Sequence, residues 1–395
     1  MVGGGTGRPG GFVAAAVRAA GAARGVDEFF DGVMRAVSPV LRSDVWAGIT
    51  IDPGTLMNTG GHYRQAVPLR YMPRMLDIEY REGDVNGLPE LARSPVPVGL
   101  LGDAVGGIHD RSPRFRDIIG PLGLRDEVRI LLRDRYGAWG ALILGVGRDT
   151  PPFGPEARAV AQGLAQPLGG ILRRLHLTRR AEEGDPSTGA PGPGRAPAPA
   201  LVLLDDAYTP VQASPTAGLW LDELPAPAGP RPASGPGALP PALYAVAAAV
   251  RAPGSPGSLV SWAHTRTRGR VRLHAWRLAG QEPARLAVAV EAAGPGDHIQ
   301  IVMAAYGLTP RERDIVALVL RGHSTAEIGR AARLSVHTVQ EHLTSVFDKT
   351  GVRSRRDLVA ALFTRHYEPA LLAADGTDVS AARETERMPR VPPIT

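Results

Sequence analysis

Apolar residues recur at helical intervals in three segments of the first half of the chain, residues 12–24, 27–40 and 155–177. Between the second and third of them, residues 46–51 alternate between apolar and polar side chains, as a half-buried strand does. Two further strand-like segments, residues 126–133 and 138–147, flank the typical hairpin turn Asp134-Arg135-Tyr136-Gly137. Helices beside an antiparallel hairpin predict an α+β module over residues 12–178.

The same patterns predict a second α+β module over residues 200–292. The expected strands are residues 201–205, 259–265, 271–278 and 286–291, and the expected helices are residues 216–224 and 242–251. We see no internal repeat at a fixed period along the chain.

Stretches rich in Gly, Pro and Ala separate these segments, and such a composition cannot bury a hydrophobic core. On this basis we expect residues 1–11 to be disordered and residues 179–199 to form a linker. We also expect a disordered loop at residues 225–241, inside the second module, and a flexible polar tail at residues 370–395.

Four short helices are predicted between residues 303 and 367, because helix-start signals follow one another there. A capping box begins at Thr309 and a second one at Ser324, while Ser335 and Ser354 can cap the next two helices. Gly351 stands where the third helix should end.

The third of these helices has one apolar and one polar face. At about 100° per residue, the apolar face carries Val336, Val339, Leu343, Val346, Phe347 and Thr350. The opposite face carries His337, Glu341, Thr344, Ser345 and Asp348, with Gln340 at its edge. A short capped helix that follows a tight turn is what a helix-turn-helix places in the major groove of DNA.

Residues 308–362 resemble the LuxR-type helix-turn-helix. The residues that carry the likeness include Leu308-Thr309-Pro310-Arg311-Glu312-Arg313, Glu327-Ile328, Thr338-Val339 and Gly351-Val352-Arg353-Ser354-Arg355, and their spacing holds without a gap. The resemblance implies that residues 336–349 form the recognition helix. It implies base contacts by His337, Gln340, Glu341 and Thr344, backbone contacts or scaffold roles for Thr338, Lys349, Arg353, Ser354 and Arg355, and a dimer contact through Leu358, Ala361 and Leu362.

One position departs from the common pattern, because many members of this family carry a lysine where this chain has Gln340. Residues 306–369 contain ten Lys or Arg and seven Asp or Glu, a net charge of only +3. Fewer cations near the phosphates predict weaker sequence-independent affinity and a shallower salt dependence. Gln340 can pair with adenine and Glu341 can accept from cytosine N4, so both can still recognise bases.

The composition excludes several classes of protein. None of the 395 residues is a cysteine, which rules out disulfides, Cys-ligated zinc fingers, iron–sulfur clusters and thiol nucleophiles. Lys349 is the only lysine, and its context matches neither a Walker A loop nor a protein kinase nor a pyridoxal enzyme. The net charge of +6 permits an acidic partner such as DNA without requiring one.

We expect a soluble, cytoplasmic protein. No segment approaches the roughly 20 consecutive apolar residues that a membrane helix needs. The N-terminus is rich in glycine and lacks the apolar core of a signal peptide.

Other candidate sites are better explained by ordinary structure. Gly60-Gly61-His62 and Gly106-Gly107-Ile108-His109-Asp110 could contribute to a metal site or pocket, but turns explain them better. Trp46 and Trp139 could line a cavity, although core packing is the favoured interpretation. Asp205-Asp206 is an acidic pair like that of a phosphate-accepting receiver, but the lysine that such a site requires is absent. We therefore expect no catalytic residues, no metal and no bound cofactor.

The first module, with residues 81–86 (REGDVN) and 91–97 (LARSPVP), is similar to GAF-type sensory domains, and the second module looks like a PAS-type domain. The resemblances imply a multidomain α+β protein, with GAF-like and PAS-like α/β sensory modules before an all-α, four-helix helix-turn-helix domain. They imply a one-component transcriptional regulator that binds double-stranded DNA as a homodimer and senses a small-molecule effector or a protein partner. Two alternatives stay open: sensory modules that only dock another protein, and a signalling enzyme, such as a hydrolase, with a DNA-targeting C-terminal domain.

Overall fold

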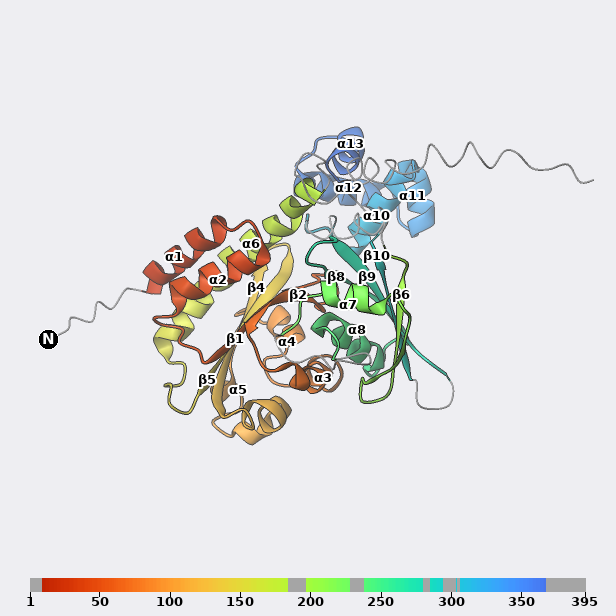
Figure 1. The fold of residues 1–395 in the computed structure, drawn as a ribbon. Helices are drawn as coiled ribbons and strands as arrows, with labels where there is room; N and C mark the ends of the chain where they lie inside the picture. Colours follow the sequence, from red (N-terminus) through yellow and green to blue (C-terminus); the bar gives the residue numbers. More distant parts are fainter. Residues whose placement is uncertain are drawn as a thin grey trace, which may run out of the picture. The chain divides into compact units, whose positions relative to one another are not determined.

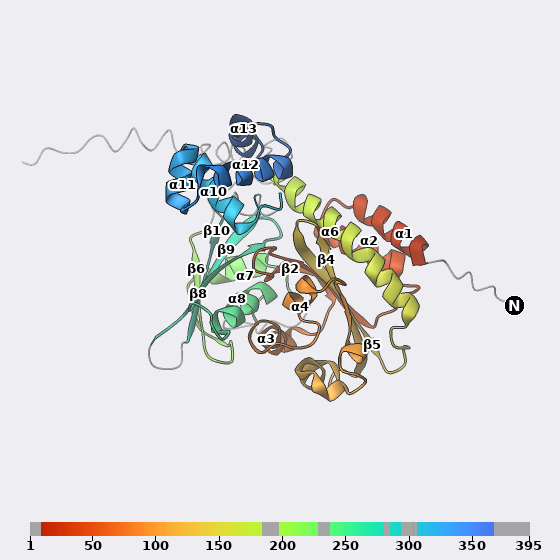
Figure 2. The ribbon, with the colours of Figure 1, turned by 180° about the vertical axis from the view of Figure 1, so that it is seen from behind.

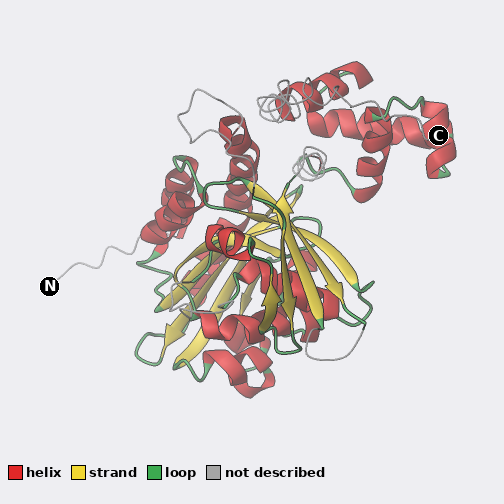
Figure 3. Ribbon diagram, turned by 45° about the vertical axis from the view of Figure 1, so that its right-hand side comes forward, coloured by secondary structure: helices red, strands yellow, loops and turns green. Residues whose placement is uncertain are grey.

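The computed structural model describes residues 9–183, 197–227, 238–279, 285–293, 303 and 306–366. The chain divides into two compact units, the first taking in residues 1–179 and 196–293 and the second residues 180–195 and 294–395. The first unit contains two antiparallel five-stranded sheets, whereas the described part of the second is helical (Figures 1 and 3).

The first module places one sheet between two sets of helices. Its helices are α1 (Pro9–Gly21), α2 (Val26–Val37), α3 (Met72–Asp77), α4 (Leu88–Arg93), α5 (Leu101–Ala104) and α6 (Pro155–Glu183), with short turns η1 (Leu69–Tyr71), η2 (Ile78–Glu82), η3 (His109–Arg111) and η4 (Phe115–Ile119). Its strands, β1 (Val45–Ile51), β2 (Asn58–Gln65), β3 (Val98–Leu100), β4 (Leu124–Asp134) and β5 (Gly137–Gly147), have the order β2-β1-β5-β4-β3.

Helices α1, α2 and α6 cover one face of this sheet (Figure 2). Close packing there depends on glycine, because a Cβ at Gly48 would lie 2.2 Å from the ring of Phe30 on α2. Helix α4 packs on the opposite face, where Leu88 and Leu91 join Ile49 in one buried cluster. Both faces of the sheet are therefore buried.

The second module has the same strand order as the first. It contains β6 (Ala200–Leu204), β7 (Pro210–Ala213), α7 (Ala217–Glu223), α8 (Pro241–Arg251), β8 (Ser258–His264), β9 (Arg270–Arg277) and β10 (Leu286–Ala292), with the sheet order β7-β6-β10-β9-β8. Numbered within each module, both orders are 2-1-5-4-3. The two modules thus repeat one topology, although the sequence shows no repeat.

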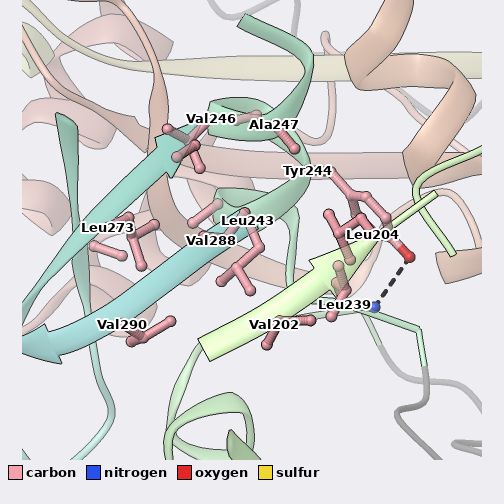
Figure 4. Packing of buried hydrophobic residues seen from close by; sticks show 14 of the residues in the cluster. Val202, Leu204, Leu239, Leu243, Tyr244, Val246, Ala247, Leu273, Val288 and Val290 are labelled. Atoms are coloured by element: carbon pink, nitrogen blue, oxygen red, sulfur yellow. Dashed lines mark hydrogen bonds between the residues drawn. The ribbon is translucent and has the colours of Figure 1, made fainter. Parts of the chain in front are cut away.

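Helix α8 is buried almost all round and packs on the inner face of this second sheet. Leu243 and Val246 lie against Val202, Leu273 and Val288 from three different strands (Figure 4).

One hydrophobic cluster spans the two modules. Met72 and Leu76 of α3, in the first module, belong to the same buried cluster as the α8 and sheet residues of the second. A polar contact crosses the same boundary, where the Tyr208 hydroxyl donates to the carboxylate of Asp77. The modules, which the sequence predicted on either side of a linker, therefore pack as a single unit.

The boundaries of the expected elements differ at a few points. Helix α1 includes residues 9–11, which were expected to be disordered, and α6 continues to Glu183, past the expected end at residue 177. Short elements such as β3, β7 and α3 to α5 were not predicted. The expectations for residues 1–8, 184–196, 228–237 and 367–395 lie outside the described residues.

The turn expected at Gly60 and Gly61 is instead part of strand β2. Gly60 and Gly61, predicted as a turn, lie inside this strand with φ angles of +144° and +149°. A Cβ at Gly61 would lie only 2.3 Å from the carbonyl oxygen of Gly48 on β1. The two glycines therefore reflect a close approach between strands.

The structure describes four short helices in the C-terminal domain over residues 310–366, as the capping signals predicted. They are α10 (Pro310–Leu320), α11 (Thr325–Ala332), α12 (Val336–Thr350) and α13 (Arg355–His366). Each helix contributes to one buried cluster, through residues such as Ile315, Ile328, Val339 and Leu358. None of the helices that the structure describes is long and apolar enough to cross a membrane.

Candidate DNA interface

Side-chain caps fix where the helices of the C-terminal domain begin. Thr309 Oγ1 accepts from the Glu312 amide at 3.3 Å, while Glu312 accepts from the Thr309 amide at 2.7 Å, which completes the predicted capping box. Ser324 and Glu327 form the second box in the same way. Ser335 caps α12 by accepting from the Thr338 amide at 3.0 Å.

The turn between α11 and α12 packs tightly against α11. Its Leu334 amide donates to the Gly329 carbonyl at 2.8 Å, and a Cβ at Gly329 would lie 2.9 Å from the Leu334 carbonyl oxygen. Arg333 closes α11 in a left-handed conformation with φ +55°, and Arg311 donates to the carbonyl of Ala332. These contacts hold α12 at a defined angle to α11.

Helix α12 buries one face and exposes the other. Val339, Leu343, Val346 and Thr350 are buried in the domain core, as predicted. Val336 departs from the prediction because its side chain is 48% exposed at the start of the helix.

The four candidates for base contacts all lie on the exposed face of α12. His337, Gln340, Glu341 and Thr344 are exposed. His337 Nε2 lies 3.6 Å from a Glu341 carboxylate oxygen, and Thr344 Oγ1 donates to the Gln340 carbonyl at 3.0 Å. The side chain of Gln340 is therefore exposed on the same face as the other three candidates.

Lys349, a candidate for backbone contact, points into the domain instead of outward. Its ammonium group donates to both carboxylate oxygens of Glu312, at 2.8 and 2.6 Å. Ser345, predicted on the polar face, also donates to Glu312, at 2.7 Å. Although burial favours the neutral acid, the hydrogen bonds from Lys349, Ser345 and Thr309 hold the pKa of Glu312 below its usual value.

Of the other candidates for contact with the DNA backbone, three are bonded within the domain and one is exposed. Arg355 donates to the carbonyls of His323 and Val319, and Ser354 caps α13 by accepting from the Asp357 amide at 3.0 Å. Thr338 is partly buried, with its hydroxyl 2.9 Å from that of Ser335. Arg353 is exposed and, within the described part of the chain, has no ion pair.

The candidates for a dimer contact are placed mainly inside the domain. Leu358 and Leu362 are 0% and 1% exposed and belong to its hydrophobic core. Ala361 lies between them in α13. The two leucines therefore pack inside the domain, whereas Arg356 and Ala360 of the same helix are exposed.

Two arginines close to α12 were not among the predicted contacts. Arg330 lies in the last turn of α11, Arg333 lies in the turn before α12, and both are exposed. The sequence signal for Arg333 is its position two residues before Ser335, the cap of α12. Its left-handed backbone, unusual for a residue other than glycine, could not be read from the sequence.

The remaining candidates of the first unit have structural roles. Trp46 and Trp139 are 7% and 1% exposed, in agreement with core packing. Gly106 and Gly107 have positive φ angles, as a turn requires, and Asp205 Oδ1 accepts from the amides of Ala207 and Thr209.

His62 has closer acidic neighbours than the sequence suggested. Its two ring nitrogens lie 2.8 Å from Asp27 and 3.1 Å from Asp31, both on α2. Even so, among the residues the structure describes, no group of three or more His, Asp or Glu side chains could hold a metal ion.

Residues 307–362 match the family described as "Bacterial regulatory proteins, luxR family". A putative HTH-type transcriptional regulator of Mycobacterium bovis is 41% identical over 73 residues, which cover 18% of this chain and 8% of the relative. The monoamine regulon transcriptional regulator of Klebsiella aerogenes is 43% identical over 53 residues, which cover 13% of this chain and 23% of the relative. This chain thus spans less than a quarter of the length of either relative.

Two solved structures share weaker similarity. One is the VqmA–ligand–DNA complex of Vibrio cholera, with 18% identity and a TM-score of 0.20 over 43% of this chain and 84% of that one. The other is the bacteriophytochrome RpBphP3 of R. palustris, with 12% identity and a TM-score of 0.29 over 70% of this chain and 61% of that one. On the family match alone, residues 307–362 form a LuxR-family helix-turn-helix domain, and that match extends no further along the chain.

Proposed function

We propose that this chain is a one-component transcriptional regulator that binds double-stranded DNA through α12. The observation that carries the proposal is the capped, exposed polar face of α12, held behind the tight α11–α12 turn of a LuxR-family domain. A helix presented in this way fits the major groove, where its N-terminal half meets base edges.

Base recognition is assigned to His337, Gln340, Glu341 and Thr344. A glutamine carboxamide can bond adenine at N6 and N7, and a glutamate accepts from cytosine N4. Because His337 and Glu341 lie 3.6 Å apart, their pairing would hold the carboxylate in place as it approaches a base.

Phosphate binding is assigned to Arg353, Arg330 and Arg333, together with the free amides at the start of α12. These guanidinium groups are exposed, and a helix N-terminus attracts anions. Lys349, Ser354 and Arg355 act on DNA binding indirectly, through the hydrogen bonds that hold the helices together.

A homodimer would place two α12 helices on half-sites about one helical turn apart. Dimerisation compensates for the weak charge of a single domain, whose residues 306–369 carry a net charge of only +3. We assign the dimer contact to the exposed side of α13, because Leu358 and Leu362 are buried.

The first unit is proposed to act as the sensor, with a GAF-like first module and a PAS-like second module. Its support is the sequence resemblance together with two antiparallel sheets that are packed with helices. An effector or a protein partner would act through different affinities for two states of the dimer.

Selection of binding sites from a pool of random duplexes, carried out with the full chain, tests the proposal. We expect enrichment of a sequence with two half-sites and a footprint covering both. A fragment of residues 303–367 should select the same half-site with lower affinity. Failure of both proteins to enrich any sequence above background would refute the DNA-binding function.

A further inference from the structure

A hollow of about 440 Å³ in the first module is lined by cationic, apolar and aromatic side chains. It lies between the η3–η4 segment and the open end of the β4–β5 hairpin, where β4 begins and β5 ends. Three arginines, Arg116, Arg125 and Arg148, line it together with a single aspartate, Asp110. We call this feature the basic hollow.

The fold brings these arginines together from three separate segments. Arg116 belongs to η4, Arg125 lies near the start of β4, and Arg148 directly follows β5. Leu124 pairs with Gly147 across the hairpin, and the register then shifts between Leu124 and Asp126. This β-bulge leaves Arg125 exposed between two buried neighbours, and bulges commonly redirect a side chain in this way.

Protein carboxylates do not neutralise the arginines of the basic hollow. Among the described residues, none of the three guanidinium groups has a carboxylate oxygen within 4.0 Å. Arg116 donates to the backbone carbonyl of Asp110 at 2.6 Å and not to its carboxylate. The neighbouring buried Asp126 is occupied by backbone amides, those of Gly102 at 3.2 Å and Glu127 at 2.9 Å.

Three unneutralised cations around one concave surface repel each other, and a bound anion would convert that repulsion into attraction. Guanidinium groups also present paired N–H donors that match the oxygens of a phosphate or a carboxylate. The charge and geometry of the basic hollow thus favour an anionic ligand.

One side of the basic hollow is apolar and aromatic. The rings of His109 and Phe115 lie 4.8 Å apart between their centroids, and Leu124 completes this side. The volume falls within the range of about 300–1,000 Å³ that is usual for small-molecule sites. A ligand with an anionic head and a small apolar body would use both parts of the surface.

We propose that the basic hollow binds a small organic anion whose phosphate or carboxylate group contacts Arg116, Arg125 and Arg148. The ring of Phe115 and the side chain of Leu124 contact its apolar part. The site lies within the first module and does not depend on DNA binding by the C-terminal domain.

Calorimetric titration of the full chain with phenyl phosphate, at constant ionic strength, tests this proposal. We expect saturable binding that Arg125→Gln and Arg148→Gln each weaken about tenfold, which corresponds to about 1.4 kcal/mol. Arg35→Gln is the matched control, because Arg35 is an exposed arginine on α2 and lies outside the hollow. Absence of saturable binding of both phenyl phosphate and benzoate, or an equal loss in the Arg35 variant, would overturn the proposal.

Two further measurements separate the contributions of the anionic head and the apolar body of the ligand. Inorganic phosphate should bind more weakly than phenyl phosphate, since it cannot contact the apolar side. Comparison with benzoate shows whether a carboxylate can replace the phosphate group, and binding of either aromatic anion supports the site.

Hydrogen–deuterium exchange of the unmodified chain provides evidence that does not depend on how the variants fold. Phenyl phosphate should slow exchange in residues 109–119 and 124–126. Protection confined to other segments would contradict the assignment.

Discussion

At the scale of single residues, some cations and polar groups of the C-terminal domain bond within the domain, and others are exposed. Lys349 and Arg355 bond to groups of their own domain, Glu312 in the first case and backbone carbonyls in the second. Gln340 and Arg353 are exposed and are therefore available to DNA. Substitutions in the two groups should accordingly affect different properties.

Gln340→Ala should lower discrimination between a selected site and a scrambled duplex. A lost bidentate base contact costs about 1–3 kcal/mol on the cognate site and little on the scrambled one. The comparison is Arg353→Ala, which removes an exposed cation and should weaken both duplexes alike while reducing the salt slope by about 1. Gel-shift titrations at several salt concentrations measure both effects, and equal losses on the two duplexes for Gln340→Ala would contradict its role.

Glu312→Gln should destabilise the C-terminal domain near neutral pH by about 1–3 kcal/mol, since Lys349 would lose its anionic partner. The pKa of Glu312 in the folded chain lies below the ordinary value of 4.5. Its stabilising effect is therefore fully present above about pH 4.5 and is lost as the pH falls through the lower folded-state pKa.

Urea unfolding of residues 303–367 between pH 3 and pH 7, followed by circular dichroism, measures this dependence. The wild-type domain should lose stability on acidification more steeply than the variant does. Parallel pH profiles for the two proteins would show that the Glu312–Lys349 pair contributes nothing to the acid sensitivity.

At the scale of elements, α12 is positioned by the ends of its neighbours. The α11–α12 turn leaves no room for a Cβ at Gly329, which lies within a buried part of α11. Gly351 ends α12 in a left-handed conformation with φ +70° but has open space around it. Gly329 is thus required for close packing, whereas Gly351 is required for a left-handed backbone conformation.

Gly329→Ala should shift the turn and weaken DNA binding by more than its loss of stability explains. The added methyl group would lie 2.9 Å from a backbone oxygen that cannot rotate away. Overpacking of this kind costs about 1–3 kcal/mol. Gly351→Ala, the control, should cost about 1 kcal/mol through its left-handed backbone and leave the affinity of the folded domain unchanged. Equal affinities of the two folded variants for the selected site would refute a positioning role for Gly329.

Helix α13 offers a test of the dimer contact. Leu358→Ala removes a fully buried side chain and should cost about 2–5 kcal/mol of stability. Ala360→Glu changes an exposed residue, so it should preserve the melting temperature while weakening cooperative binding to two half-sites. Analytical ultracentrifugation with and without DNA checks this, and unchanged cooperativity in the Ala360 variant would remove α13 from the dimer contact.

At the scale of the whole molecule, the two sheets of the first unit are joined by a common core and by buried polar contacts. Asp77 is at the centre of one of these, bonded to Arg81 of its own module and to Tyr208 of the other. Although burial favours the neutral acid, these two hydrogen bonds hold the pKa of Asp77 below its ordinary value. A change in one module should therefore be felt in the other.

Tyr208→Phe should lower the single unfolding transition of the first unit, with a loss of about 1–3 kcal/mol. Tyr244→Phe is its counterpart, because the Tyr244 hydroxyl accepts from the Leu239 amide at 3.0 Å entirely within the second module. If the modules unfold together, differential scanning calorimetry will show both variants shifting the same transition. Two separate transitions, with only one of them affected, would mean that the modules unfold independently.

The sequence by itself determined the helices of the C-terminal domain and the face that α12 exposes. Capping boxes and helical periodicity are local, so Ser335 and the apolar series from Val339 to Thr350 could be interpreted without a fold. The β4–β5 hairpin was predicted for the same reason, because its turn residues adjoin its strands.

Only the tertiary structure decided how distant parts of the chain meet. Whether Lys349 faces DNA or Glu312 depends on how α12 packs on α10, and the burial of Leu358 depends on the same core. The shared core of the two modules joins Met72 to residues far along the chain, and the basic hollow gathers arginines from three segments. Contacts between residues distant in sequence leave no local periodicity, so only the folded chain reveals them.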